Sequence, residues 1–214
     1  MNKEIIFLLL LFFVGCVKEE TINFDSENKD WITSYKIGDN FIMKDNNDIS
    51  HSFSMTDNSH YFNESEGGYF FITTHKENTE YHYQNFTSNY GIQFSLSLTA
   101  GFEPFGDEIY IKLDNIGFAF DFKHQTISRI DSPFGYLSKT MTDKGYENNV
   151  TINSTVEIID SYIVNDIQYS EVLHFAFKDY IEKWEPYTVT EIFITKKYGL
   201  IKYILNNDLI FERK

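Results

Sequence analysis

The stretch HKENTEYH, from His75 to His82, is the one place where residue types and spacing together suggest a chemical site. Two imidazoles and a carboxylate can hold a divalent metal ion. If the stretch is a hairpin whose loop has an even number of residues, His75 faces His82, with Cβ atoms about 5 Å apart and with Glu77 and Glu80 on the same side. An odd loop places the two histidines on opposite faces. Because the turn residues are not the Asn-Gly pair that a tight loop prefers, we assign neither a metal site nor a cofactor.

Motifs of other chemistries are absent from the sequence. It contains no Gly-x-Ser-x-Gly nucleophile elbow, no His-Glu-x-x-His helix and no glycine-rich phosphate loop. With 32 acidic residues, some carboxylates will be neighbours by chance, so their presence does not indicate a glycosidase. We therefore predict that the protein is not an enzyme.

The charge and the cysteine content exclude several classes of partner and of site. A formal net charge of -14 argues against nucleic acid, whose phosphates require a basic patch, and against adsorption on anionic lipid by charge alone. A single cysteine excludes an internal disulfide framework and a cysteine-based zinc site. The position of that cysteine then becomes informative.

An uninterrupted apolar run over residues 5–14 precedes Cys16, and the polar Lys18, Glu19 and Glu20 follow it. A membrane-crossing helix needs about 20 apolar residues, so this run is too short to span a bilayer. Its length is that of the apolar region of a secretory signal peptide. The run therefore predicts export.

The tetrapeptide Phe13-Val14-Gly15-Cys16 resembles the lipobox of bacterial lipoproteins. In that family the cysteine thiol is diacylated, the chain is cut before it, and the new amino terminus usually receives a further acyl chain. The resemblance implies a signal peptide over residues 1–15 and a lipid anchor, with acyl chains such as palmitate, on Cys16. Two or more such chains hold a protein stably on a bilayer. Phe13 departs from the leucine that is usual at the first position.

The residues after Cys16 carry a second resemblance. Lys18, Glu19 and Glu20 look like the lysine-plus-two-acids export tag of surface lipoproteins of the Bacteroidota. This implies an outer-membrane protein exposed on the cell surface, with a periplasm-facing orientation as the alternative. The ending EIFITKKYGLIKYIL is similar to the close of many uncharacterised lipoproteins of the same group, and it carries no assigned chemistry.

The mature chain divides into a tether and one domain. Residues 16–30 are polar, with little periodicity, and predict a lipidated, flexible tether. From residue 31 to residue 214 the dominant hydrophobic period is two, as in IQFSLSLT at residues 92–99, which is typical of half-buried antiparallel strands. We predict ten to twelve strands, a longest loop at residues 132–149, and one all-β domain. Its architecture is a single antiparallel sheet curled into a half-barrel or lipocalin-like barrel, with a two-layer β-sandwich as the alternative.

Three groups of side chains are candidates for binding. Exposed tyrosines could stack on sugar rings, inward phenylalanines could line an apolar cavity, and a basic C-terminal group could face phosphates. The simpler interpretations are core packing for the aromatic groups and solvated hairpin ends for the basic one. The groups are Tyr61, Phe62, Tyr69, Tyr81, Tyr83 and Tyr90; Phe118, Phe120 and Phe122; and Lys196, Lys197, Lys202, Arg213 and Lys214.

An anchor followed by a β domain without a catalytic motif favours a non-enzymatic binding or assembly protein of the outer membrane. The alternatives are a carrier that encloses an apolar ligand in its curved sheet and a glycan-binding surface lipoprotein. The membrane contact is the covalent lipid on Cys16, and the sequence leaves open whether the partner is a protein or a glycan.

Overall fold

The computed structural model describes residues 17–69, 72–101, 106–114, 116–132, 135–142, 145–148, 154–177 and 188–214. Cys16 and the apolar run before it lie outside the described residues, so the predicted signal peptide and lipidation site receive no structural account. Within the described part of the chain, no helix has the length and the hydropathy of a membrane span.

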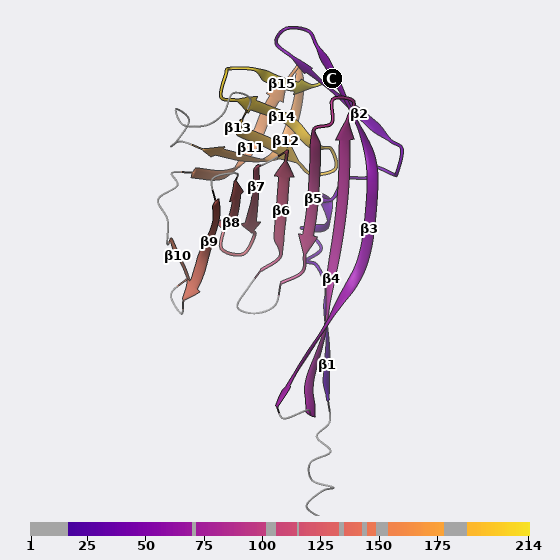
Figure 1. Ribbon diagram of the computed structural model, residues 1–214, viewed down its shortest axis with the longest axis vertical. Helices are drawn as coiled ribbons and strands as arrows, with labels where there is room; N and C mark the ends of the chain where they lie inside the picture. Colours follow the sequence, from indigo (N-terminus) through magenta and orange to yellow (C-terminus); the bar gives the residue numbers. More distant parts are fainter. Residues whose placement is uncertain are drawn as a thin grey trace, which may run out of the picture.

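The strands form one sheet that is nearly closed into a barrel with one unsealed seam (Figure 1). Neighbouring strands are antiparallel, except that β1 pairs with β4 in parallel. The predicted single curled antiparallel sheet is confirmed. The fifteen described strands are β1 (Lys18–Ile22), β2 (Asn40–Asp45), β3 (Ser50–Tyr69), β4 (Ile72–Ser88), β5 (Gln93–Thr99), β6 (Glu108–Leu113), β7 (Ile116–Asp121), β8 (Thr126–Ser132), β9 (Gly135–Thr142), β10 (Gly145–Asn148), β11 (Ser154–Val164), β12 (Ile167–Phe177), β13 (Val189–Thr195), β14 (Gly199–Leu205) and β15 (Ile210–Arg213).

The sheet grows in two directions from a central pair. The strand order is β10-β9-β8-β7-β6-β5-β4-β3-β2-β15-β14-β13-β12-β11, so β2 lies beside the last strand and both halves are meanders. Meanders suit this sequence because its turns carry the residues that tight hairpins need. Asn165 and Asp166, for example, have φ of 49° and 64° between β11 and β12.

The core fills the inside of the curled sheet. Phe94, Leu96 and Leu98 are fully buried, as their alternation predicts. Phe118 of β7 stacks on Phe175 of β12 with ring centroids 4.0 Å apart, although eight other strands lie between β7 and β12 in the sheet. Such a contact requires the sheet to curl until its two halves meet, so side chains occupy the interior at this level.

The longest hairpin, β3 and β4, projects from the barrel at the lower end of Figure 1. β5 pairs with β4 only as far as Tyr81. Toward the tip of the hairpin, β1 takes the place of β5 along β4 and pairs Lys18 with His75 and Ile22 with Thr79. The hairpin expected at residues 75–82, with its turn at residues 76–79, is wrong, because β3 and β4 pair from Phe53 and Ser88 as far as Tyr69 and Ile72. The residues of the expected turn are polar because the projecting strands are exposed to solvent, and turns are polar for the same reason.

The predicted loop at residues 132–149 is also largely wrong. β9 and β10 occupy most of it, and β9 pairs with β8 through four residue pairs. Gly135 and Gly145 each begin a strand. The glycines therefore stand at the first positions of two strands rather than within one long loop.

Residues 23–35, which we call the strap, cross the inner face of the sheet. The strap holds a short 3-10 helix (Lys29–Trp31) and buries Phe24 and Trp31, which are 7% and 2% exposed. Trp31 packs on Phe122 with ring centroids 5.6 Å apart. The structure thus differs from the flexible tether expected at residues 16–30, since β1 joins the sheet from Lys18 and the strap joins the core.

Candidate functional site

Buried polar side chains hold the strap in place. Gln84, which is fully buried on β4, accepts hydrogen bonds from the backbone N and the Oγ1 of Thr33 at 3.0 and 2.8 Å and donates one to its carbonyl at 2.9 Å. Glu80 accepts a hydrogen bond from the backbone N of Phe24 at 2.8 Å. Buried polar groups must be paired, so these contacts fix the path of the strap.

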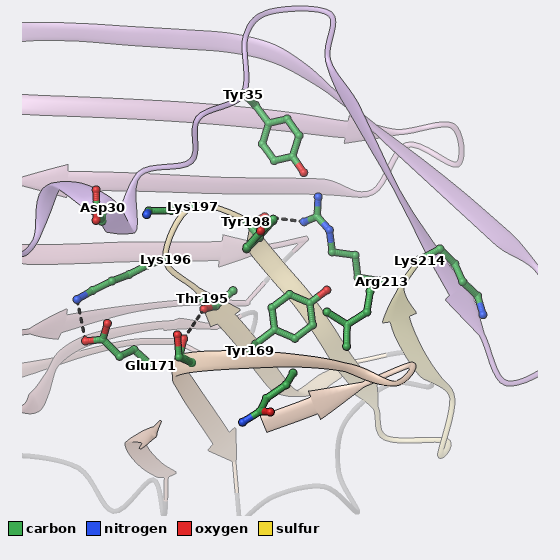
Figure 2. Close-up of a pocket in the computed structure, with 13 residues that line it drawn as sticks. Asp30, Tyr35, Tyr169, Glu171, Thr195, Lys196, Lys197, Tyr198, Arg213 and Lys214 are labelled. Atoms are coloured by element: carbon green, nitrogen blue, oxygen red, sulfur yellow. Dashed lines mark hydrogen bonds and ion pairs between the residues drawn. The ribbon is translucent and has the colours of Figure 1, made fainter. Parts of the chain in front are cut away.

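A groove of about 620 Å³ opens where the strap meets three other segments (Figure 2). The segments are the first residues of β12, the turn between β13 and β14, and the C-terminal end of β15. This volume is that of an ordinary small-ligand site. The lining residues are Asp30, Tyr35, Ile167, Gln168, Tyr169, Ser170, Glu171, Thr195, Lys196, Lys197, Tyr198, Arg213 and Lys214.

Backbone hydrogen bonds join the turn to the strap. The N–H of Lys197 donates to the carbonyl of Asp30 at 2.8 Å, and the N–H of Ser34 reaches the carbonyl of Lys197 at 3.5 Å. Gly199 ends the turn with φ of 66°, and a Cβ there would lie 2.7 Å from Thr33 Cγ2. Only glycine allows both this conformation and this close approach. The Lys197 side chain takes no part in these contacts and stays exposed.

Arg213 lies at the floor of the groove and is 7% exposed. Its Nη1 donates to the carbonyls of Tyr198 and Leu200 at 2.6 and 3.1 Å, and its guanidinium lies 4.6 Å from the ring centroid of Phe41 and 5.4 Å from that of Tyr35. Burial lowers the pKa of Arg213 to about 10, so the group remains charged at neutral pH. Among the described residues, no carboxylate lies within 4 Å of it.

Tyrosines form the walls of the groove. Figure 2 shows Tyr35 and Tyr169 on either side of the Arg213 guanidinium, with Tyr198 beside it. Tyr198 is 53% exposed and meets Tyr169 edge-on, with ring centroids 5.7 Å apart. The groove thus offers hydroxyl donors and the free face of an aromatic ring around a buried cation.

A strained backbone position shapes the groove at β12. Glu171 has φ of 50° inside the strand, which costs a residue with a side chain roughly 1–2 kcal/mol. Its carboxylate accepts a hydrogen bond from Lys196 Nζ at 2.8 Å, and Lys196 also lies 5.7 Å from the Trp31 ring. This pair connects β12 with the turn across the mouth of the groove.

The structure brings together four of the five basic residues singled out in the sequence, namely Lys196, Lys197, Arg213 and Lys214. Lys202 is not among them, since its ammonium pairs with Glu212 at 3.1 Å. Sequence reasoning missed the tyrosines of the groove and Asp30. The one available signal was the adjacency of Tyr198 to the two lysines of the turn.

The two histidines of HKENTEYH do not meet. His75 and His82 both belong to β4, seven residues apart, so they point to opposite faces of the sheet and cannot share a metal ion. His82 instead stacks on His60 of β3, with ring centroids 5.1 Å apart, and His60 Nε2 lies 2.9 Å from Glu80. Within the described ranges, no group of three or more His, Cys, Asp or Glu side chains could hold a metal ion.

This histidine pair gives the fold a pH dependence. Burial, and after it the neighbouring His60, lowers the pKa of His82 below 6.5 against the opposing effect of Glu80. The unfolded chain therefore takes up this proton at higher pH than the folded one, and stability is lost as the pH falls through 6.5. When the pH is lowered from about 7.5 to about 5, the free energy of unfolding should fall less in His82→Gln than in the wild type, and chemical denaturation at each pH measures this fall. Because burial also lowers the pKa of His51, some dependence should remain, and equal losses in both proteins would contradict this assignment.

Tyr61, Tyr81 and Tyr83, three of the residues singled out in the first half of the domain, lie on a different surface, whereas Tyr90 packs on His51 with ring centroids 4.5 Å apart. Tyr61 and Tyr81 face each other across β3 and β4 with ring centroids 5.0 Å apart, and Tyr61 is 44% exposed. They alternate with the core residues of these strands and so lie on the outer face.

Comparisons with known proteins add no relative. No protein-family model, no curated protein and no solved structure matches the chain.

Proposed function

We propose that this protein is a lipid-anchored protein of the bacterial outer membrane, displayed on the cell surface, that binds a ligand without catalysing a reaction. Acyl chains on Cys16 form the anchor. The observation that carries the binding role is the groove, an open site with tyrosine walls and a buried guanidinium beside the packed core.

The place of the N-terminal strand supports this arrangement. β1 begins two residues after Cys16 and runs along the projecting hairpin, whereas the C-terminal end, which contributes Arg213 and Lys214 to the groove, lies at the opposite end of Figure 1. An anchor at Cys16 would hold the groove away from the bilayer. Lys18, Glu19 and Glu20 expose their side chains on β1, as a recognised export tag requires.

The packing of the barrel disfavours the carrier alternative. Phe118 and Phe120, expected to line a cavity in a carrier, are 0% and 1% exposed and belong to the packed core. Phe122 packs edge-on against Phe120 with ring centroids 5.3 Å apart. Core side chains thus take the space that an apolar ligand would need around Phe118 and Phe120, whereas Phe122 lines a second open pocket of about 540 Å³ beside Trp31.

The Cys16→Ser substitution tests the anchor. We expect wild-type protein made in a lipoprotein-processing bacterium to enter the detergent phase and to have a mass that matches a chain beginning at an acylated Cys16. Each buried methylene contributes about 0.8 kcal/mol, so two or more chains should hold nearly all of the protein in that phase. The variant should lack the acyl mass and its detergent partitioning should fall.

Val17→Ser is the matched control, because it adds the same hydroxyl next to the anchor and retains the thiol. It should partition like the wild type. An unacylated wild type that partitions like Cys16→Ser would overturn the anchor. Alanine at Lys18, Glu19 and Glu20 together should leave acylation intact but remove sensitivity to protease added to whole cells. Unchanged sensitivity would overturn the role of these residues in surface export.

A further inference from the structure

We propose that the groove binds an acidic saccharide, a sugar chain that carries carboxylate, sulfate or phosphate groups. This inference rests on the proposed function, because it names the ligand class of the same groove. Three features carry it: a local reversal of charge, a buried cation without a carboxylate partner among the described residues, and an exposed aromatic face beside that cation.

The charge of the groove is opposite to that of the chain. Its lining has four basic and two acidic residues, whereas the whole chain has 18 basic and 32 acidic residues. Lys196 and Glu171 neutralise each other through their 2.8 Å contact. Of the other lining side chains, Lys197, Arg213 and Lys214 are basic and Asp30 is acidic, so the groove has a local excess of positive side-chain charge that attracts anions.

Arg213 is the strongest of these groups because it is buried. A buried charge is costly unless it is paired, and here only two backbone carbonyls and aromatic faces offset that cost. These contacts also hold the guanidinium in one orientation, which favours carboxylate, sulfate and phosphate oxygens in fixed positions. An anionic group entering the groove would supply the missing counterion.

The tyrosines favour a sugar over a bare anion. The half-exposed ring of Tyr198 gives a stacking face at the rim, and the hydroxyls of Tyr35 and Tyr169 can bond to a polyol. The groove is open and lined mostly by polar and charged side chains, which suits a chain of sugar rings and not an apolar ligand.

The test is a titration of the full-length protein in neutral detergent with matched oligosaccharides. The probes are oligogalacturonate, a sulfated galactan oligomer and a phosphorylated mannan oligomer, each beside its neutral parent, together with inorganic phosphate. We expect at least one acidic probe to bind about tenfold or more tightly than its parent, with an affinity that falls as salt is added.

Two variants test the site without touching Arg213, whose loss would also remove hydrogen bonds of the fold. Lys197→Glu should weaken the acidic probe about tenfold or more, because the Lys197 side chain holds no structural contact. Tyr198→Ala should weaken the saccharide and leave inorganic phosphate unchanged. The matched control is Lys112→Glu, the same reversal at an exposed position of β6, which should leave affinity within about twofold.

Each of the following outcomes overturns the inference: every acidic probe binds no better than its parent, no probe binds at all, or Lys197→Glu and Lys112→Glu act alike. Tight binding of a neutral parent that Tyr198→Ala weakens would overturn the acidic class while retaining the groove as a binding site. Since the Cys16→Ser experiment measures partitioning and not affinity, failure of the anchor is seen separately.

Discussion

Replacing Phe118 with alanine is expected to lower the free energy of unfolding by about 3–5 kcal/mol. Phe118 is fully buried and stacks at 4.0 Å on Phe175, so the substitution leaves a cavity where the two halves of the curled sheet meet. Urea denaturation of the variant measures the loss. A cycle with Phe175→Ala should add a coupling of about 0.5–1.5 kcal/mol for the ring pair.

Phe62→Ala is the matched control for this substitution. Phe62 is 45% exposed on the projecting hairpin, and its loss should cost less than about 1 kcal/mol. A cost for Phe118→Ala no larger than that of the control would show that the interior is loosely packed, as a carrier requires. It would remove the main structural argument against an enclosed ligand.

Gln84→Leu is expected to cost roughly 3–5 kcal/mol, because it keeps the volume of the side chain but removes three hydrogen bonds to Thr33. The strap would then have buried polar groups without partners. We expect amide hydrogen exchange to accelerate more in residues 31–35 than in the rest of the protein, because Gln84 holds this segment on the sheet.

Gln93→Leu is the matched control, since Gln93 is exposed on β5 and the same change there should stay within about 0.5 kcal/mol. Similar stability of the two variants would mean that the strap is held by its buried aromatic side chains and not by Gln84. Since the strap carries Asp30 and Tyr35 to the groove, Gln84→Leu should also weaken any ligand bound there.

Most of the fold could be predicted from the sequence, because the alternation of apolar and polar residues along a strand is a local signal. In residues 92–99 each inward position is apolar, so the strand, its face and its half-burial follow without tertiary information. The tight turn at Asn165 and Asp166 is also locally determined, because both residue types tolerate the positive φ that it needs.

The wrong predictions concern polar segments, because a polar sequence is typical of turns and tethers and also of segments that polar tertiary contacts hold in place. Residues 75–79 are polar because they belong to the projecting hairpin and are partly exposed. Residues 18–30 are polar although they pair with β4 or form hydrogen bonds to the buried Glu80 and Asp107. A polar segment held by distant buried polar partners has the same composition as a tether. Only the tertiary contacts separate the two.

The groove could not be assembled from the sequence for a related reason. Asp30, Tyr169, Tyr198 and Arg213 belong to four segments that the curling of the sheet brings together. The basic residues could be named as candidates from the sequence. The burial of Arg213, by contrast, depends on its packing against Phe41 and Tyr35, and only the structure shows that no described carboxylate lies beside it.

Hydrogen exchange of the full-length protein, with and without the tightest acidic oligosaccharide, tests the central claim that binding takes place in the groove and not in the core of the barrel. The account predicts slower exchange in residues 31–35, 167–171 and 195–199, with no change in the outer tyrosine face of β3 and β4 or in β7. Protection confined to that tyrosine face, or to β7 and the core of β12, would contradict it.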